Sequence, residues 1–253
     1  MRIGIVGCGT IGSFVYDSLL EEQTSQVTFV FDKDKNKTEC LKTSLVIDSL
    51  EAYEERKADL VVEAAGQEAV KEIAPLILTK TDLLVVSVGA FADETFLEDM
   101  ARIARKNNTS IYITPGALPG IEALLGLRKD LTEVELLTRK NPDTLGLEDK
   151  SKQTVYDGDA KEACRLFPRN INVAATVALM GTGFERTRVR ILSDPDAVQN
   201  EHRITAKGGF GIWQLVVRSK PSDANPSTGL LTLLSVLDTI ERIKAGDRRL
   251  KIA

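Results

Sequence analysis

The chain has 253 residues, a net charge of −4 and 43% hydrophobic residues, which is enough apolar material for a substantial buried core. An acidic chain is not expected to bind nucleic acid or an anionic membrane surface, and no apolar stretch approaches the ~20 residues that cross a bilayer. Its three cysteines are far apart and form no C-x-x-C pair, so we expect a reduced, cytoplasmic protein without disulfides or a metal site.

The first twelve residues, MRIGIVGCGTIG, form a short apolar run followed by Gly7, Gly9 and Gly12 in the G-x-G-x-x-G spacing. The first glycine allows a tight turn, the second lets backbone approach a pyrophosphate, and the third lets a helix lie close to the strand. A helix-like segment follows, so the N–H groups of Thr10 and Ile11 are expected to face the anion. The pattern predicts dinucleotide binding; a structural turn without a ligand is the alternative.

A second predicted strand, residues 27–31, ends at Asp32, which lies 20 residues beyond Gly12. An acidic residue at this distance is placed to bind both ribose hydroxyls of an adenosine. Lys33 and Lys35 follow closely and could accept a 2′-phosphate, whereas Asp32 would repel one. We therefore expect NAD as the cofactor, with NADP possible.

The next part of the chain alternates apolar strands with amphipathic helices. Strands are predicted at 60–64, at DLLVVSVGAF and at 110–114, the second of them ending in the small residues Ser87, Gly89 and Ala90. Asp93 is a predicted helix N-cap. Between residues 33 and 57 we expect only a short helix and a weak strand. This alternation predicts an α/β fold with a Rossmann-type doubly wound parallel sheet, whose ligand lies beyond the carboxyl ends of the strands. Residues at those ends are candidates for cofactor contact: Ala64, Ala65, Gly66, Ser87, Gly89, Gly116 and Ala117.

The pattern changes near residue 117. The segments EVELLTRK, RTRVRILSD, NEHRITAKGG and FGIWQLVVRS alternate polar with apolar residues, which is typical of half-buried antiparallel strands. We expect a dinucleotide-binding domain at 1–117 and a second α+β domain with a mixed or antiparallel sheet at 118–225, which carries the substrate and catalytic site and the dimerisation surface. An apolar-rich helix within 226–253 is expected to pack back on the first domain or on a partner subunit.

Five residues of the second domain could carry chemistry. His202 is the only histidine, and its unperturbed pKa suits a general base near neutrality, although a histidine without a chemical role is equally compatible with the pattern. Arg139 and Lys140 close a predicted strand and could bind a carboxylate, or could form a solvated strand end. Asn172 and Thr176 share a face of a predicted helix, where an amide can hold a nicotinamide carboxamide or a polar group of the substrate.

Together these motifs resemble the L-aspartate dehydrogenase family along nearly the whole chain. The resemblance is carried by IGIVGCGTIG, VVEAAGQEAV, SVGAFAD, TPGALPGIEAL, TRK, FPRNINVAATVAL, VRILSDPDAVQNEHRI and NPSTGLLTLLSVL. It implies an NAD(P)-dependent enzyme that converts L-aspartate to iminoaspartate, which hydrolyses to oxaloacetate and ammonia. It also implies the reverse amination and a role in supplying iminoaspartate for pyridine-nucleotide biosynthesis.

The resemblance also implies roles for single residues. His202 corresponds to the catalytic histidine, and Ala117 and Asn172 to residues that contact the cofactor. Asn200, retained in the N-x-H motif, is grouped with Arg139, Lys140 and Thr176 as a substrate-binding residue. Members of the family are commonly homodimers.

One departure from the family pattern lies beside the histidine. Glu201 and Arg203 flank it where many relatives carry an aliphatic residue before and an acidic residue after, so an acid and a base are expected as its neighbours. Two other readings stay open: a different two-domain amino-acid dehydrogenase of the homoserine type, and a non-catalytic NAD(H)-sensing protein. A sensor would be expected to carry an output domain, and no segment of the sequence suggests one.

Overall fold

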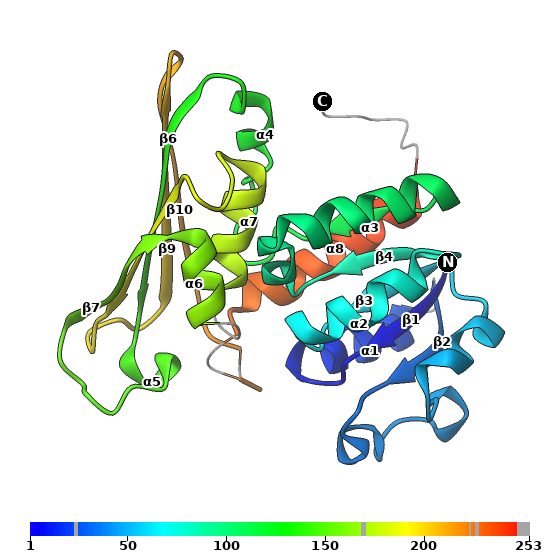
Figure 1. Cartoon of the computed structure of the whole chain (residues 1–253). Helices are drawn as coiled ribbons and strands as arrows, with labels where there is room; N and C mark the ends of the chain where they lie inside the picture. Colours follow the sequence, from blue (N-terminus) through cyan, green and yellow to red (C-terminus); the bar gives the residue numbers. More distant parts are fainter. Residues whose placement is uncertain (23–24, 168–170, 223, 226–227, 247–253) are drawn as a thin grey trace.

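The structure, a computed structural model shown in Figure 1, contains two five-stranded sheets that form the cores of two domains. It describes residues 1–22, 25–167, 171–222, 224–225 and 228–246. Residues 226–227 and 247–253 of the predicted C-terminal segment lie outside the described residues. Among the described helices, none is long and apolar enough to span a membrane.

The first sheet is entirely parallel, with the strand order β2-β1-β3-β4-β5. Its strands are short apolar runs whose side chains alternate between two covered faces, as expected for a buried parallel sheet. The predicted Rossmann-type doubly wound sheet is therefore confirmed. The strands are β1 (Arg2–Val6), β2 (Gln26–Phe31), β3 (Leu60–Glu63), β4 (Asp82–Val85) and β5 (Ile111–Ile113).

Helices cover both faces of this sheet (Figure 1). Val62 and Leu84 belong to an apolar cluster that includes residues of α1 and α8, while Val61 and Leu83 belong to a second cluster with residues of α2 and α3. The predicted N-cap of α3 is confirmed, because the Asp93 side chain accepts a hydrogen bond from the first turn. The four helices are α1 (Thr10–Glu22), α2 (Gln67–Ile77), α3 (Glu94–Asn107) and α8 (Leu230–Ala245).

Two segments differ from the sequence prediction. The weak strand expected between residues 33 and 57 is reduced to one bridge between Val30 and Val46, and three 3₁₀ turns fill the rest. Strand β4 stops at Val85, because the Ser87 N–H donates to the side chain of Glu63 rather than to a strand. The 3₁₀ turns are η1 (Lys35–Thr38), η2 (Thr43–Leu45) and η3 (Leu50–Arg56), and a fourth, η4 (Val88–Ala92), follows β4.

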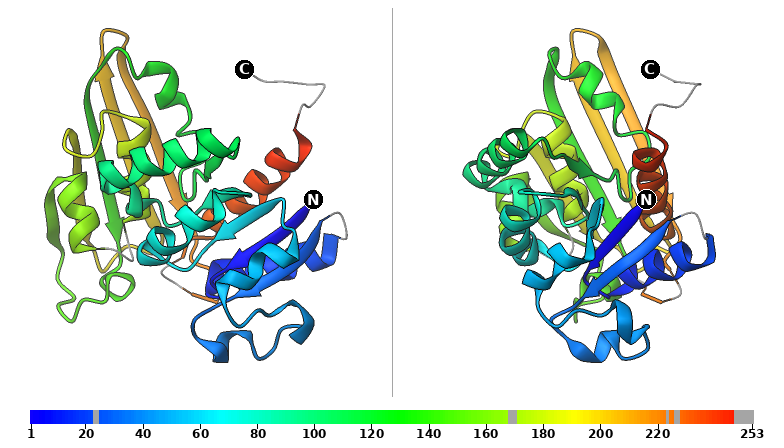
Figure 2. Two further views of the ribbon diagram at one scale, coloured as in Figure 1. Left: turned by 45° about the vertical axis from the view of Figure 1, so that its right-hand side comes forward. Right: turned by 90° about the vertical axis from the view of Figure 1, so that its right-hand side faces the viewer.

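The second sheet is mixed, with the order β10-β9-β6-β8-β7, and this confirms the predicted sheet type. The β6–β8 pair is parallel and the other pairs are antiparallel. Helices α6 and α7 lie on the face toward the first domain, where α7 packs against η4; the opposite face carries no described helix (Figures 1 and 2). The elements are β6 (Leu131–Lys140), β7 (Gln153–Asp159), β8 (Thr187–Ser193), β9 (Asn200–Gly208), β10 (Gly211–Ser219), α4 (Ala123–Leu127), α5 (Pro142–Leu145), α6 (Ala160–Leu166) and α7 (Asn172–Met180).

The last helix, α8, follows the second sheet and returns to the first domain (Figure 2). Val236 and Ile240 are fully buried there in the same apolar cluster as β1 and α1. The Ser235 hydroxyl lies 3.2 Å from the hydroxyl of Thr114, just beyond β5. The chain therefore crosses between the domains twice, once after β5 and once before α8.

Shortening a buried side chain of α8 tests whether this packing stabilises the molecule. Ile240→Ala removes three carbon atoms from a site with no exposed surface, so we expect a loss of about 2–5 kcal/mol in the free energy of unfolding. Leu234→Ala, on the same helix but 49% exposed, is the matched control and should cost well under half as much. Denaturant unfolding followed by circular dichroism measures both; equal losses would contradict the packing described.

Candidate active site

In the turn from Gly7 to Gly12, here called the glycine turn, the fold itself requires two of the three glycines. Gly7 has φ +96°, and a Cβ on Gly12 would lie 1.7 Å from the Gly7 carbonyl oxygen, so neither position accepts a larger residue without a shift. A Cβ on Gly9, in contrast, would meet no atom within 4 Å. Because α1 begins at Thr10, the open space at Gly9 adjoins the N-terminus of a helix, a favourable position for an anion.

The carboxylate of Asp32 is held in a fixed orientation at the end of β2. One oxygen accepts the Cys8 N–H at 2.7 Å and the other accepts the Asp34 N–H at 2.9 Å. The lysines that follow are engaged with acids: Lys33 with Glu72, Lys35 with Asp48, and Lys37 with Asp32 itself at 3.8 Å.

A buried carboxylate that the sequence reading missed organises the neighbouring strand ends. Glu63 is fully buried and accepts the N–H groups of Ala65 and Gly66 at 2.8 Å, together with the N–H and hydroxyl of Ser87 at 3.0 and 2.8 Å. Burial raises the pKa of Glu63, and these four donors act in the opposite direction. The signal for it was a single acid in the apolar run LVVEA. Its hydrogen bonds tie the end of β3 to the end of β4, where the candidate residues Ala64, Ala65, Ser87 and Gly89 lie.

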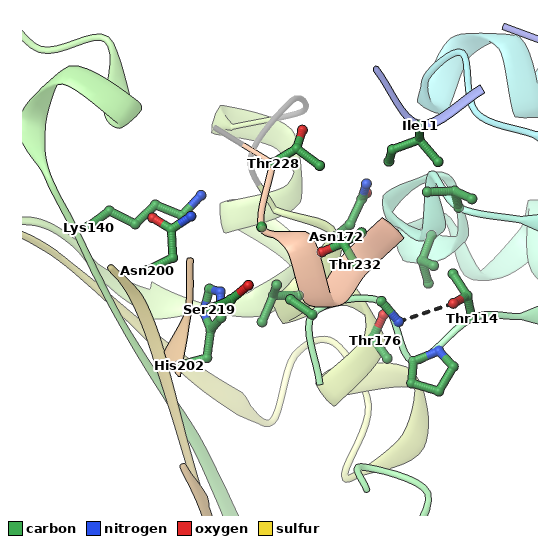
Figure 3. Close-up of a pocket in the computed structure, with 17 residues that line it drawn as sticks. Ile11, Thr114, Lys140, Asn172, Thr176, Asn200, His202, Ser219, Thr228 and Thr232 are labelled. Atoms are coloured by element: carbon green, nitrogen blue, oxygen red, sulfur yellow. Dashed lines mark hydrogen bonds between the residues drawn. The ribbon is translucent and has the colours of Figure 1, made fainter. Parts of the chain in front are cut away.

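Strand register places one row of polar residues on the inner face of the second sheet. Thr138 of β6 pairs with His202 of β9, and Ser219 of β10 pairs with Asn200. Side chains two residues apart share a face of a strand, so Lys140 lies on the same face as Thr138. Lys140, Asn200, Ser219 and His202 accordingly line one cavity (Figure 3).

His202 is buried, with 3% of its surface exposed, and its Nδ1 lies 3.0 Å from the Thr138 hydroxyl. Burial and, to a smaller extent, the charge of Lys140 lower the pKa of His202 to about 3, so the ring is neutral at physiological pH. Nε2 has no hydrogen-bond partner in the described part of the chain. The ring is thus held at one nitrogen and left available at the other.

Lys140 and Asn200 are two buried polar side chains that open onto the cavity. Lys140 is 6% and Asn200 4% exposed, and neither side chain makes an ion pair or hydrogen bond with another described residue. Burial lowers the pKa of the Lys140 ammonium to about 8, which still leaves most of it charged at pH 7. A buried cation without a protein partner is suited to an anionic ligand.

The structure does not bring Arg139 to this cavity. Its guanidinium donates to the buried carboxylate of Asp194 at 2.8 Å on the opposite face of the sheet. Arg139 and then Lys152 hold the pKa of Asp194 well below its usual range. Strand alternation was the signal that could have separated Arg139 from Lys140 in the sequence.

The residues that flank His202 also face away from it. Glu201 accepts hydrogen bonds from Arg218 at 2.6 Å and from Arg203 at 3.3 Å on the outer face. The acid and the base expected beside the histidine therefore neutralise each other outside the cavity. The charge that acts on the ring comes from Lys140 instead.

The opposite wall of the cavity comes from the first domain, α7 and the start of α8 (Figure 3). Here the buried side-chain oxygen of Asn172 has no hydrogen-bond partner among the described residues. Eight predicted residues line the cavity: Ile11, Gly116, Ala117, Lys140, Asn172, Thr176, Asn200 and His202. Others lie outside its lining, at the glycine turn, the strand ends or the outer face: Gly7, Gly9, Thr10, Gly12, Asp32, Ala64, Ala65, Gly66, Ser87, Gly89 and Arg139. Sequence reasoning missed four hydroxyl residues, because no sequence motif marks them as part of a site: Thr138, Ser219, Thr228 and Thr232.

Two other kinds of chemistry find no support in the described residues. Burial raises the pKa of the Cys8 and Cys164 thiols to about 12, and neither lines the cavity, so neither is placed as a nucleophile. Within the described ranges, no group of three or more His, Cys, Asp or Glu side chains could hold a metal ion.

A dinucleotide fits the residues that are present. The turn is open at Gly9, the carboxylate of Asp32 is oriented at the end of β2, and an unpaired amide oxygen at Asn172 faces a cavity containing a neutral histidine. A Rossmann-type domain with this turn, set against a second domain that supplies a buried histidine, defines an NAD(P)-dependent dehydrogenase.

Comparison with known proteins identifies the family. The model for the NAD-binding domain of homoserine dehydrogenase matches residues 7–114, and that for the C-terminal domain of aspartate dehydrogenase matches residues 124–243. L-Aspartate dehydrogenases from Nitrosopumilus maritimus and Methanosarcina acetivorans are 33% and 37% identical to this chain, covering 97% and 96% of it and 97% of each relative. The chain belongs to the L-aspartate dehydrogenase family.

Solved structures agree with this assignment. Aspartate dehydrogenase from Thermotoga maritima superposes with a TM-score of 0.82 at 28% identity, over 100% of this chain and 99% of that one. A hyperthermophilic archaeal homoserine dehydrogenase in complex with NADPH gives a TM-score of 0.63 at 14% identity over 99% of each chain, which is a likeness of fold alone.

Two alanine substitutions distinguish the glycine that cofactor binding requires, Gly9, from a glycine that the fold itself requires, Gly12. Gly9→Ala adds a methyl group to open space, so we expect normal thermal stability but NADH binding weakened by on the order of tenfold or more. Gly12→Ala drives a methyl group into the Gly7 carbonyl and should lower stability as well. NADH fluorescence titration and thermal unfolding measure the two effects. Unchanged NADH affinity in Gly9→Ala would contradict the prediction that the pyrophosphate binds at this turn.

Proposed function

We propose that this protein is an NAD-dependent L-aspartate dehydrogenase. It oxidises L-aspartate to iminoaspartate, which hydrolyses to oxaloacetate and ammonia, and it catalyses the reverse amination, feeding pyridine-nucleotide synthesis. The observation that carries the proposal is the cavity itself, in which a buried, unpaired Lys140 and a neutral His202 face the unpaired amide oxygen of Asn172. The names of the relatives support aspartate as the substrate.

The first domain and α7 hold the cofactor in this proposal. Asp32 would hold the adenosine ribose, the backbone at Gly9 would accommodate the pyrophosphate, and the oxygen of Asn172 would accept a hydrogen bond from the nicotinamide carboxamide. The bound cofactor would supply the exchange of a hydride with Cα of the substrate. Holding both reactants in register lowers the entropic part of the barrier.

The second domain binds the substrate and moves the proton. Lys140 and Asn200 anchor a carboxylate through a charge and an amide. Thr138 fixes the ring of His202 through Nδ1, and Nε2 accepts a proton from the substrate ammonium or from the water that attacks the imine. The surrounding apolar and hydroxyl side chains, including Val173 and Thr176, exclude bulk water.

The proposal is tested by following the absorbance of reduced nicotinamide. Purified protein is given NAD or NADP with L-aspartate and, separately, oxaloacetate, ammonia and the reduced cofactor. Turnover in both directions supports the proposal. Turnover with L-homoserine but not L-aspartate would favour the homoserine-type alternative, and saturable NADH binding without turnover of either would favour a sensor.

Replacing the histidine tests its role in proton transfer. We expect His202→Ala and the less disruptive His202→Gln to lower kcat by ~10²–10⁴, because an acid–base group contributes that much. The dissociation constant for NADH should stay within about twofold of the parent value, since the ring lies on the substrate side of the cavity. A kcat within threefold of the parent in both variants would remove His202 from the mechanism.

We further propose that NAD is preferred to NADP. Asp32 would repel a 2′-phosphate, and Lys33, Lys35 and Lys37 are each engaged with an acid. Asp32→Ser should shift the ratio of kcat/KM values toward NADP by on the order of tenfold or more. Glu72→Gln frees Lys33 but leaves Asp32 in place, so this control should keep the preference for NAD. An unchanged ratio of the kcat/KM values for NAD and NADP in Asp32→Ser would contradict the binding of the adenosine ribose by Asp32.

A cytoplasmic homodimer completes the proposal. It is supported by the family resemblance and by the outer face of the second sheet, where Ile212 and Val216 of β10 are 68% and 46% exposed. Light scattering gives the mass in solution, and a mass of 27.7 kDa, that of one chain, would contradict the dimer.

A further inference from the structure

The charges around the cavity are unbalanced. Among the described residues that line it, Lys140 and His202 are the only titratable side chains. The segments packed around them contribute neutral groups: Thr114 to Ala117 after β5, Asn172 to Thr176 of α7, Ser219 of β10, and Thr228 to Thr232 at the start of α8. No carboxylate of the described chain lines the cavity.

The carboxylates closest along the strands are engaged elsewhere. Glu201, next to His202 in the chain, binds Arg218 and Arg203 on the outer face. Asp194 donates its N–H to the Lys140 carbonyl, but its carboxylate binds Arg139 and Lys152. The ammonium of Lys140 is therefore a buried cation whose counter-charge is not supplied by the described residues.

Register brings this cation close to the histidine. Thr138 is directly opposite His202, and Lys140 lies two residues further along the same face of β6, so the two groups are diagonal neighbours on the sheet. Diagonal neighbours have backbones about 7–8 Å apart, within reach of a long side chain. In a buried site, like charges at such separations are poorly screened.

We propose that Lys140 makes proton acceptance by His202 conditional on a bound carboxylate. Without an anion in the cavity, the ammonium opposes formation of the imidazolium. A substrate carboxylate on Lys140 removes this opposition, so the base becomes competent only when a substrate is in place. The inference rests on the proposed function and assigns Lys140 an electrostatic role in addition to anchoring.

Two further observations agree with this coupling. Among the charged groups of the described residues, Lys140 is the one that lowers the pKa of His202, after burial itself. The first residues of α7 and the N-cap of α8 also line the cavity, and helix N-termini add positive potential. The charge of Lys140 and these helix N-termini thus both favour the neutral ring until an anion binds.

The lone histidine makes the coupling directly measurable. Because His202 is the only histidine in the chain, the ring ¹⁵N resonances of labelled protein need no further assignment. The protein is saturated with NAD, which unlike the reduced form is stable in acid, and titrated from pH 3 to 8, with and without succinate, a dicarboxylate that has no amine to oxidise. Succinamide, its neutral analogue, is the ligand control, and circular dichroism at each pH checks that the protein stays folded.

We expect succinate, but not succinamide, to raise the fraction of protonated His202 about tenfold at about pH 5, which corresponds to a shift of about one pH unit in the titration. Lys140→Met should show the raised fraction without succinate, because the opposing charge is gone. Lys140→Arg keeps the charge and should titrate like the parent. Arg203→Met removes a cation next to His202 on the opposite face and should also titrate like the parent.

Two results would overturn the coupling: an unchanged titration with succinate bound, or parent-like titration in Lys140→Met. Failure of succinate to bind saturably would count against the dicarboxylate substrate of the proposed function. The comparison of Lys140→Met with the parent, which needs no ligand, would still decide the coupling. A merely structural role for Lys140 predicts no change in the histidine titration of a folded Lys140→Met variant.

Discussion

The site depends on the two-residue alternation of strands β6 and β9. Their antiparallel register sets Thr138 against His202 and, on the same face, places Lys140 and Asn200 at the edge of the cavity. A slip of one residue would exchange this row for the outer one, where Arg139 binds Asp194. The apolar inner residues of the same strands, such as Leu136 and Ile204, are fully buried and oppose such a slip. The register of β6 and β9 that packs the core is therefore also the register that assembles the site.

The sequence predicted what depends on local patterns. The parallel sheet, the mixed sheet and the capped start of α3 follow from apolar periodicity and turn chemistry, and they were found as predicted. The end of β4 was missed because it depends on Glu63, whose donors come from a neighbouring strand end. Arg139 and Lys140 could not be ranked by charge, since only their opposite orientation separates them. The hydroxyls of Ser219 and Thr228 reach the cavity through tertiary packing, which no local motif encodes.

Burial is used in two opposite ways in this molecule. Glu63 is surrounded by four donors, so its cost of desolvation is partly offset within the protein and the strand ends are tied together. Lys140 and the oxygen of Asn172 have no such partners in the described part of the chain, so a ligand is needed to offset their desolvation. Buried polar groups that have hydrogen-bond partners within the protein hold the scaffold together, and those without such partners bind the ligand. The distinction separates structural from ligand-binding polar residues without reference to any motif.

The double crossing of the chain between the domains restricts how they can move. One crossing follows β5 at Thr114 and the other precedes α8 at Thr228, and both segments line the cavity. Two bodies joined at two points rotate most easily about the line through those points, as a door does about two hinges. Because both connecting segments themselves line the cavity, and its walls come from both domains, a rotation about that line would change the width of the cavity directly. Exchange of ligand and closure of the site around it would then be a single movement.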